Sequence, residues 1–369
     1  MGFKPRWFTA DDVRKWEERR VGRREFIGIG AGVVAGGALL AGCGGSGSGS
    51  TGTATSAATS TAAAGAVGEG KTIGLILNGF NEYDQNLATG VLKALEGTKY
   101  DFVGLQGNFA APAEVSNFET MISRKVDGIV VLPNTVQGAS RGALAAKAAG
   151  IPVANLLWSE PTPGDPAYVV RVRVDSVHGG ELTGKWITEN TDPGGIMLVT
   201  GVPGQGFSED ITKGLRQALA QYGNGKWEIV ASQPGLFTRT KAITVAQNMM
   251  TANPDAKIIF CYAAEMANGV ASFLKKSDKT GMVLIGDDGN DEMVTWIKSP
   301  WMQSARYYSG AQEGRVGTEA LRQYLEEDKQ FPEPLDVKQG MVTKANIDTW
   351  LRDQPLSYPE FMSEVKKIG

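Results

Sequence analysis

The chain has 369 residues, of which 42% are hydrophobic and 21% are charged. This composition excludes an intrinsically disordered protein, and at roughly 150 residues per domain the length suggests two domains. The formal net charge is −3, so no overall positive field exists to attract nucleic acid, and no nucleic-acid partner is expected. A single histidine and two cysteines exclude a histidine-rich zinc site and a cysteine cluster, and we assign no metal and no cofactor.

The first 42 residues have the features of an export signal. Arg23 and Arg24 precede a charge-free run over residues 26–42, which is rich in Gly and Ala and is short for a membrane-spanning helix. The run ends in Leu-Ala-Gly before Cys43, and the segment resembles a twin-arginine signal joined to a bacterial lipoprotein signal. The resemblance implies cleavage before Cys43 and lipid on its thiol, which anchors the protein to the outer face of the cell membrane, in the periplasm or at the cell surface. An uncleaved anchor helix is the alternative.

Residues 43–70 are predicted to form a flexible tether, because from residue 44 onward they contain almost only Gly, Ser, Thr and Ala. Residues 65–72 match the phosphate-loop pattern, but that loop needs a strand before it and a helix after it. Here the tether precedes the pattern and an apolar strand follows it, so we exclude nucleotide binding at this position.

From residue 72 onward, apolar runs alternate with segments of helical spacing. The predicted strands are 72–77, 101–106, 127–132, 152–157, 168–174, 196–200, 227–232, 257–262, 282–286 and 302–308. The predicted helices are 85–96, 113–125, 137–149, 177–190, 208–222, 239–252, 264–276, 290–298 and 311–327. This alternation predicts an α/β fold, and about ten strands favour two parallel sheets over one. A closed eight-fold barrel is the competing architecture.

Ligands of open α/β sheets bind beyond the carboxyl ends of the strands, so the residues after each predicted strand are the candidates for a binding site. These candidates are Asn81, Glu82, Asp84, Gln85, Trp158, Glu209, Phe237, Tyr262, Asp288 and Tyr308. They combine hydrogen-bonding groups with aromatic faces, a composition that suits a small polyhydroxylated or amine-bearing ligand. Taken singly, most of them are also explained as loop or helix-capping residues.

Several short motifs occur in an order and spacing that together are specific. They include Ser-Gln-Pro at 232–234, Phe237, Ala-Gln-Asn-Met-Met-Thr-Ala-Asn-Pro-Asp at 246–255, and Glu-Met-Ala at 265–267. Residues 72–330 resemble the type I periplasmic sugar-binding proteins of ABC importers, and most closely the ribose-binding branch. The resemblance implies an extracytoplasmic monomer that captures a small sugar or polyol between two lobes and delivers it to the permease by hinge closure.

The family fold implies two similar doubly wound parallel-sheet lobes joined by a three-crossing hinge. On that basis we expect 71–174 plus 310–338 to form lobe I and 175–309 plus 339–369 to form lobe II.

When the ligand-binding positions of the family are compared one by one with this chain, several residues differ from those of ribose-binding proteins. Phe237 matches a stacking aromatic and Asp288 matches a carboxylate that accepts ligand hydroxyls. Asp84 and Gln85 stand where the family has an aromatic pair. Trp158 and Glu209 stand at positions where the family has arginines. Tyr262 lies beside Ala263, which replaces an asparagine, and Tyr308 replaces a glutamine. The loss of two arginines argues against ribose itself.

Other functions remain open from the sequence. An acidic, aromatic cleft also suits a cationic or amine-type molecule, and the same fold serves as a ligand-presenting receptor for a membrane sensor. A secreted glycoside hydrolase is a third alternative, because paired carboxylates can hydrolyse glycosides. We expect no enzyme, because the lone His178 offers few routes to a catalytic triad.

Overall fold

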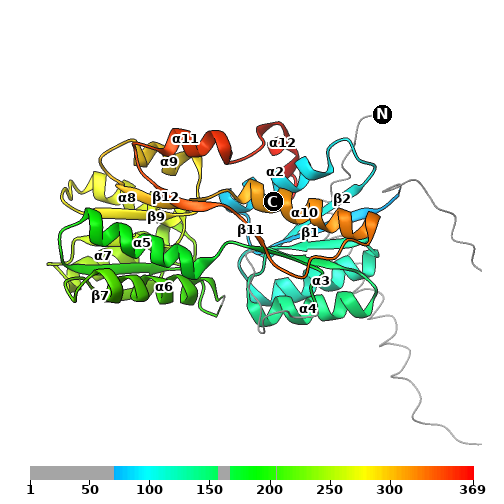
Figure 1. The fold of residues 1–369 in the computed structure, drawn as a ribbon, viewed down its shortest axis with the longest axis horizontal. Helices are drawn as coiled ribbons and strands as arrows, with labels where there is room; N and C mark the ends of the chain where they lie inside the picture. The colour runs from blue at the N-terminus through cyan, green and yellow to red at the C-terminus, as the bar shows by residue number, and fades with distance from the viewer. Residues whose placement is uncertain (1–69, 157–166, 205) are drawn as a thin grey trace, which may run out of the picture.

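A computed structural model describes residues 70–156, 167–204 and 206–369. The predicted signal residues Arg23, Arg24 and Cys43, most of the tether, and Trp158 lie outside the described residues. Within the described ranges the chain forms two α/β lobes, each built on a six-stranded, mostly parallel sheet (Figure 1). The predicted α/β fold with two doubly wound sheets is confirmed, and the barrel alternative is wrong because the two sheets are separate and open.

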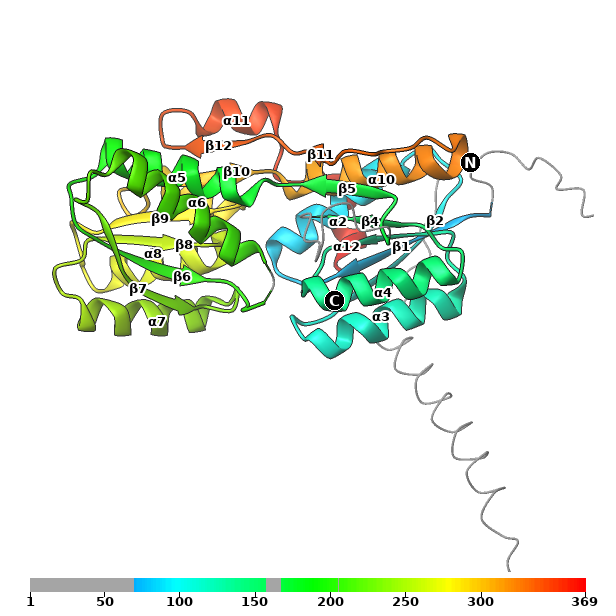
Figure 2. The ribbon, with the colours of Figure 1, turned by 60° about the horizontal axis from the view of Figure 1, so that its bottom comes forward.

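The first sheet has the strand order β11-β5-β4-β3-β1-β2. Its strands are β1 (Thr72–Leu77), β2 (Asp101–Gln106), β3 (Gly128–Val131), β4 (Val153–Asn155), β5 (Val170–Arg173) and β11 (Leu335–Asp336). Its helices are α2 (Glu82–Leu95), α3 (Ala111–Arg124), α4 (Val136–Ala148) and α10 (Gly310–Glu327). Helices α2 and α10 cover one face and α3 and α4 the other, so the central strands are continuous buried apolar runs (Figure 2).

The second sheet has the order β12-β10-β9-β8-β6-β7, and β12 runs antiparallel to β10. Its strands are β6 (Gly195–Thr200), β7 (Glu228–Pro234), β8 (Ile258–Cys261), β9 (Val283–Asp287), β10 (Ser304–Tyr308) and β12 (Gln339–Val342). Its helices are α5 (Ser176–Asn190), α6 (Phe207–Tyr222), α7 (Arg239–Ala252), α8 (Ala264–Lys276), α9 (Asp291–Ile297) and α11 (Ile347–Asp353). Here α5 and α6 cover one face and α7 and α8 the other (Figure 2).

The chain passes between the two sheets after β5, after β10 and after β11. It returns once more after α11, because the short 3₁₀ helix η1 (Pro359–Phe361) and α12 (Met362–Val365) pack on α2. Tyr358 N donates to Thr89 Oγ1 at 3.0 Å, and Ile368 lies against Gly104 of β2. We expected 339–369 in the second lobe, whereas its last residues bury Val365 and Ile368 against the first.

In the part of the chain that the structure describes, no helix is both long enough and apolar enough to cross a bilayer.

Candidate ligand-binding site

A small cavity of about 30 Å³ lies between the lobes. It is lined by Asn78, Asn81, Tyr83, Asp84, Phe109, Leu132, Phe207, Phe237, Tyr262, Ala263, Asp288 and Tyr308. Most of these residues follow the carboxyl end of a strand, and both sheets contribute. The cavity therefore occupies the place where open parallel sheets bind their ligands.

Asp84 is fixed in the cavity wall by the start of α2. Asn81 caps this helix: its Oδ1 accepts from Asp84 N at 3.1 Å, while Asp84 Oδ2 accepts from Asn81 N at 2.9 Å. This reciprocal capping box holds the Asp84 side chain in one orientation, with 1% of the residue exposed. Burial of the carboxylate raises the pKa of Asp84 to about 7, and the hydrogen bond from Asn81 opposes that shift.

Asp288 faces the cavity from the other lobe, directly after β9. Its backbone is left-handed (φ 57°), and its Oδ1 accepts from Ala264 N at the start of α8 at 3.3 Å. Burial, with a smaller contribution from the charge of Asp287, raises the pKa of the Asp288 carboxyl well above its ordinary value. Each lobe thus presents one buried carboxyl group to the ligand.

The neighbouring Asp287 forms a buried ion pair with Arg306. Arg306 of β10 donates to Asp287 Oδ1 at 2.5 Å and to Oδ2 at 2.6 Å, and neither side chain is exposed. The guanidinium also lies 4.7 Å from the centroid of the Tyr308 ring. Arg306 therefore supports the floor of the site, and its charge is matched by Asp287.

Two phenylalanines close the cavity from opposite lobes. The rings of Phe109 and Phe237 are 5.9 Å apart, and both residues have left-handed backbone conformations. Each ring lies over a glycine that follows the first strand of its lobe: a Cβ on Gly79 would be 2.1 Å from Phe109, and one on Gly201 would be 2.2 Å from Phe237. Side chains at either glycine would displace a ring from the wall. The two lobes thus build the aromatic wall in the same way.

A second aromatic contact joins the lobes beside the carboxyl groups. The rings of Tyr83 and Tyr308 meet edge to face with their centroids 5.8 Å apart. Tyr83 OH donates to Glu313 Oε2 of α10 at 2.5 Å, which fixes the tyrosine. Tyr262 OH is hydrogen-bonded to Thr212 at 2.8 Å.

Six of the ten predicted ligand residues line this cavity: Asn81, Asp84, Phe237, Tyr262, Asp288 and Tyr308. Three do not. Glu82 reaches across to the other lobe, where its Oε1 accepts from Asp291 N at 3.0 Å. Gln85 Nε2 donates to Phe80 O at 3.2 Å, and exposed Glu209 accepts from Gly204 N at 3.2 Å.

The cavity lining also includes residues outside the ten candidates: Asn78, Tyr83, Phe109, Leu132, Phe207 and Ala263. Phe109 follows a correctly predicted strand, so the strand-end rule could have found it. Asn78 directly follows β1 and could have been found in the same way.

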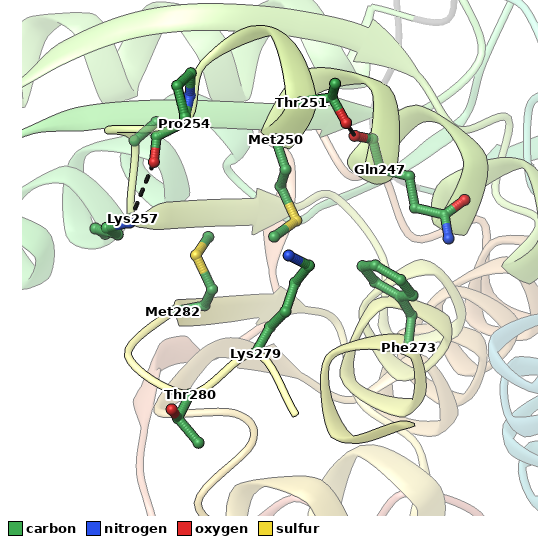
Figure 3. Close-up of a pocket in the computed structure, with 10 residues that line it drawn as sticks. Gln247, Met250, Thr251, Pro254, Lys257, Phe273, Lys279, Thr280 and Met282 are labelled. Carbon is green, nitrogen blue, oxygen red and sulfur yellow. Dashed lines mark hydrogen bonds between the residues drawn. The ribbon is translucent and has the colours of Figure 1, made fainter. Parts of the chain in front are cut away.

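A wider hollow lies at the opposite edge of the second sheet (Figure 3). It is lined by Met250, Phe273, Lys279 and Met282 among others, at the amino ends of β8 and β9. Its lining contains no carboxylate among the described residues, and only one lobe contributes. The interlobe cavity is therefore the candidate site. Among the described ranges there is also no group of three or more His, Cys, Asp or Glu side chains that could hold a metal ion.

Comparison with known proteins agrees with this geometry, since residues 73–329 match the periplasmic binding protein domain. The chain belongs to this family. It is 27% identical over 270 residues to the ribose import binding protein of Salmonella typhimurium, covering 72% of this chain and 89% of that protein. The xylitol-binding protein of Mycolicibacterium smegmatis is 22% identical over 280 residues, or 75% of this chain and 78% of that one.

Among solved structures, a solute-binding protein of an ABC transporter from Actinobacillus succinogenes, with bound D-allose, superposes with a TM-score of 0.69 at 25% identity. The match covers 76% of this chain and 99% of that one. The fold is that of the type I periplasmic binding proteins, a family of substrate-binding transport proteins rather than enzymes.

Proposed function

We propose that this protein captures a small sugar or polyol in the interlobe cavity and delivers it to the permease of an ABC importer. The observation that carries the proposal is a cavity closed by both lobes, with one buried carboxyl group and one phenylalanine ring from each. Carboxylates accept hydrogen bonds from sugar hydroxyls, and aromatic rings cover the apolar face of a sugar. Relatives named for ribose and xylitol, and a neighbour with bound allose, support the class of ligand.

Hinge closure is the step that reports binding to the permease. Several chain segments connect the lobes, and the cavity residues come from both, so a ligand contacts both lobes only when they are closed. A ligand that binds the closed form more tightly than the open form shifts the population toward the closed form. We propose that the protein acts as a monomer in this cycle and carries out no chemical step on its ligand.

The test is a thermal-shift screen of the purified protein against pentoses, hexoses and polyols. A ligand present at 100 times its dissociation constant is expected to stabilise the native state by about 2.7 kcal/mol. At least one sugar or polyol should raise the melting temperature and be recovered unchanged. No shift across the panel, or turnover of a chromogenic glycoside, would count against the proposal.

We further propose that the protein is held outside the cytoplasm by lipid on Cys43, after removal of residues 1–42. The Leu-Ala-Gly-Cys sequence after an apolar run supports this. Mass spectrometry of the protein from membranes should find acylated Cys43 as the first residue. In a Cys43→Ser variant the protein should leave the membrane fraction. Retention of residues 1–42 would contradict the assignment.

A further inference from the structure

The interlobe cavity offers its ligand several acceptor groups, namely two carboxyl groups and two side-chain amides. Among the lining residues that the structure describes, none is Lys or Arg. Arg306 lies beneath Tyr308, but its guanidinium is bound to both oxygens of Asp287.

Two of the side-chain donors in the wall are already used within the protein. Asn78 Nδ2 donates to Pro133 O at 3.3 Å, and Tyr83 OH donates to Glu313. The side-chain oxygen of Asn78, Oδ1, is buried and has no hydrogen-bond partner among the described residues. Only 7% of the residue is exposed, so water does not readily reach this atom. A buried acceptor without a partner is costly, so this atom calls for a donor on the ligand.

Asp84 adds a carboxyl group that no cation among the described residues neutralises. Its one hydrogen bond among the described residues uses Oδ2, with Asn81 N, which leaves Oδ1 for a ligand. Burial explains its raised pKa, and no positive neighbour within the described ranges lowers that pKa. A buried charge without a partner either takes up a proton or is completed by an opposite charge.

The surrounding walls suit a positive group. Six aromatic rings line the cavity, from Tyr83, Phe109, Phe207, Phe237, Tyr262 and Tyr308. Their faces carry negative charge density and attract cations when water is excluded. An ammonium group can donate hydrogen bonds but cannot accept them. It therefore complements a cavity that offers carboxylate and amide oxygens.

We propose that the ligand is a sugar or polyol bearing a protonated amine, and that Asp84 is the residue that selects the amine. This rests on the proposed function and narrows its ligand. Asp84 Oδ1 accepts from the ammonium group, Asn78 Oδ1 accepts a further hydrogen bond from the ligand, and Asp288 accepts from hydroxyl groups on the side of the second lobe.

Isothermal titration calorimetry on the purified protein tests this with matched pairs. The pairs are glucosamine with glucose, N-methylglucamine with sorbitol, and 2-amino-1,3-propanediol with glycerol, and N-acetylglucosamine serves as the neutral acylated control. In at least one pair the amine should bind about tenfold or more tightly than its neutral partner, as expected for a desolvated charge-assisted contact.

Variants separate the role of Asp84 from general stability. Asp84→Asn keeps an oxygen for the hydrogen bond from Asn81 N and removes the charge, so the amine preference should fall to within about threefold. Glu209→Gln removes an exposed carboxylate outside the cavity and should leave the preference unchanged.

Equal or tighter binding of the neutral partner in every pair would overturn the amine proposal and leave the sugar or polyol function standing. A preference that survives in Asp84→Asn would overturn the assignment to Asp84. If neither member of any pair binds, the amine proposal fails and the proposed function loses support as well.

Discussion

Asp84 and Glu82 are two residues apart at the start of α2 and have different roles. At about 100° per helical residue, their side chains leave the helix roughly 200° apart. Asp84 therefore points into the cavity, whereas Glu82 points toward α9 of the other lobe. The sequence could place both after a strand, but the direction of each side chain depends on where the helix begins. The helix begins at Glu82, three residues before the predicted start.

The buried carboxyl of Asp84 should make stability depend on pH. Its pKa is about 7 in the folded protein, against about 4 in an unfolded chain, so the native state binds more protons between these values. The contribution of Asp84 to stability is therefore greatest below about pH 4 and is lost as the pH rises through about 7. Asp84→Asn should be stabilised relative to the wild type more at pH 8 than at pH 5.

Urea unfolding of the ligand-free wild type and Asp84→Asn at both pH values measures this difference, and Glu209→Gln is the control for an exposed carboxylate. A difference in unfolding free energy that does not change between pH 5 and pH 8 would contradict the buried, uncompensated state of Asp84.

At the scale of elements, the same helix contact is built twice. In the second lobe, α5 and α6 approach so closely that a Cβ on Gly214 would lie 1.8 Å from Val177 O. In the first lobe, a Cβ on Gly90 of α2 would lie 1.9 Å from Ala311 O of α10. One helix of each close pair directly follows a crossing between the sheets: α5 in the second lobe and α10 in the first. These contacts fix the ends of the crossings relative to the sheets.

Gly214→Ala should force α5 and α6 apart, because no side-chain movement relieves a clash with a carbonyl oxygen. The expected cost is roughly 1–3 kcal/mol of unfolding free energy. Gly194→Ala is the matched control, because a Cβ there meets nothing within 4 Å. Calorimetric melting should show a lower transition temperature for Gly214→Ala alone. Equal melting of the two variants would contradict the close contact.

How much of the fold could be predicted depends on how clearly the sequence of each element is patterned. The ranges 239–252 and 264–276 match α7 and α8 at both ends, because helical spacing and the Asn-Pro stop after α7 mark them clearly. Strands β11 and β12 were missed, because their sequences Leu-Asp and Gln-Gly-Met-Val do not form the continuous apolar runs by which the other strands were found. Helices α11 and α12 were also missed, because they lie beyond the last predicted strand–helix pair and do not continue the alternation. The buried Arg306–Asp287 pair was also missed, because residue type alone does not reveal ion pairing inside a sheet.

At the scale of the whole molecule, a hydrogen bond of Glu82 joins the two lobes outside the cavity lining. Its carboxylate accepts from the first amide of α9, and Glu265, Asp291 and Glu292 lie near it on the second lobe. Partial burial, together with these negative charges, raises the pKa of Glu82. This hydrogen bond exists only when the lobes are closed, so it stabilises the closed form relative to the open one.

Glu82→Ala should therefore weaken ligand binding without touching the cavity. Loss of one hydrogen bond to a charged group should reduce the affinity for the ligand by roughly 3–10-fold. At equal ligand concentration, small-angle scattering should show a larger radius of gyration for the variant than for the wild type. Glu189→Ala, an exposed residue of α5, is the control and should bind as the wild type does. Unchanged affinity in Glu82→Ala would show that the contact does not affect closure.

The most direct test of the central claim is calorimetric titration of the wild type, Asp288→Asn and Glu209→Gln with the sugar or polyol that gives the largest thermal shift. Asparagine tolerates the left-handed backbone at position 288 and retains an acceptor for Ala264 N, so the variant should fold. The account predicts one ligand per chain, at least about tenfold weaker binding in Asp288→Asn, and wild-type binding in Glu209→Gln. Equal affinities in all three proteins would place the ligand outside the interlobe cavity and contradict the account.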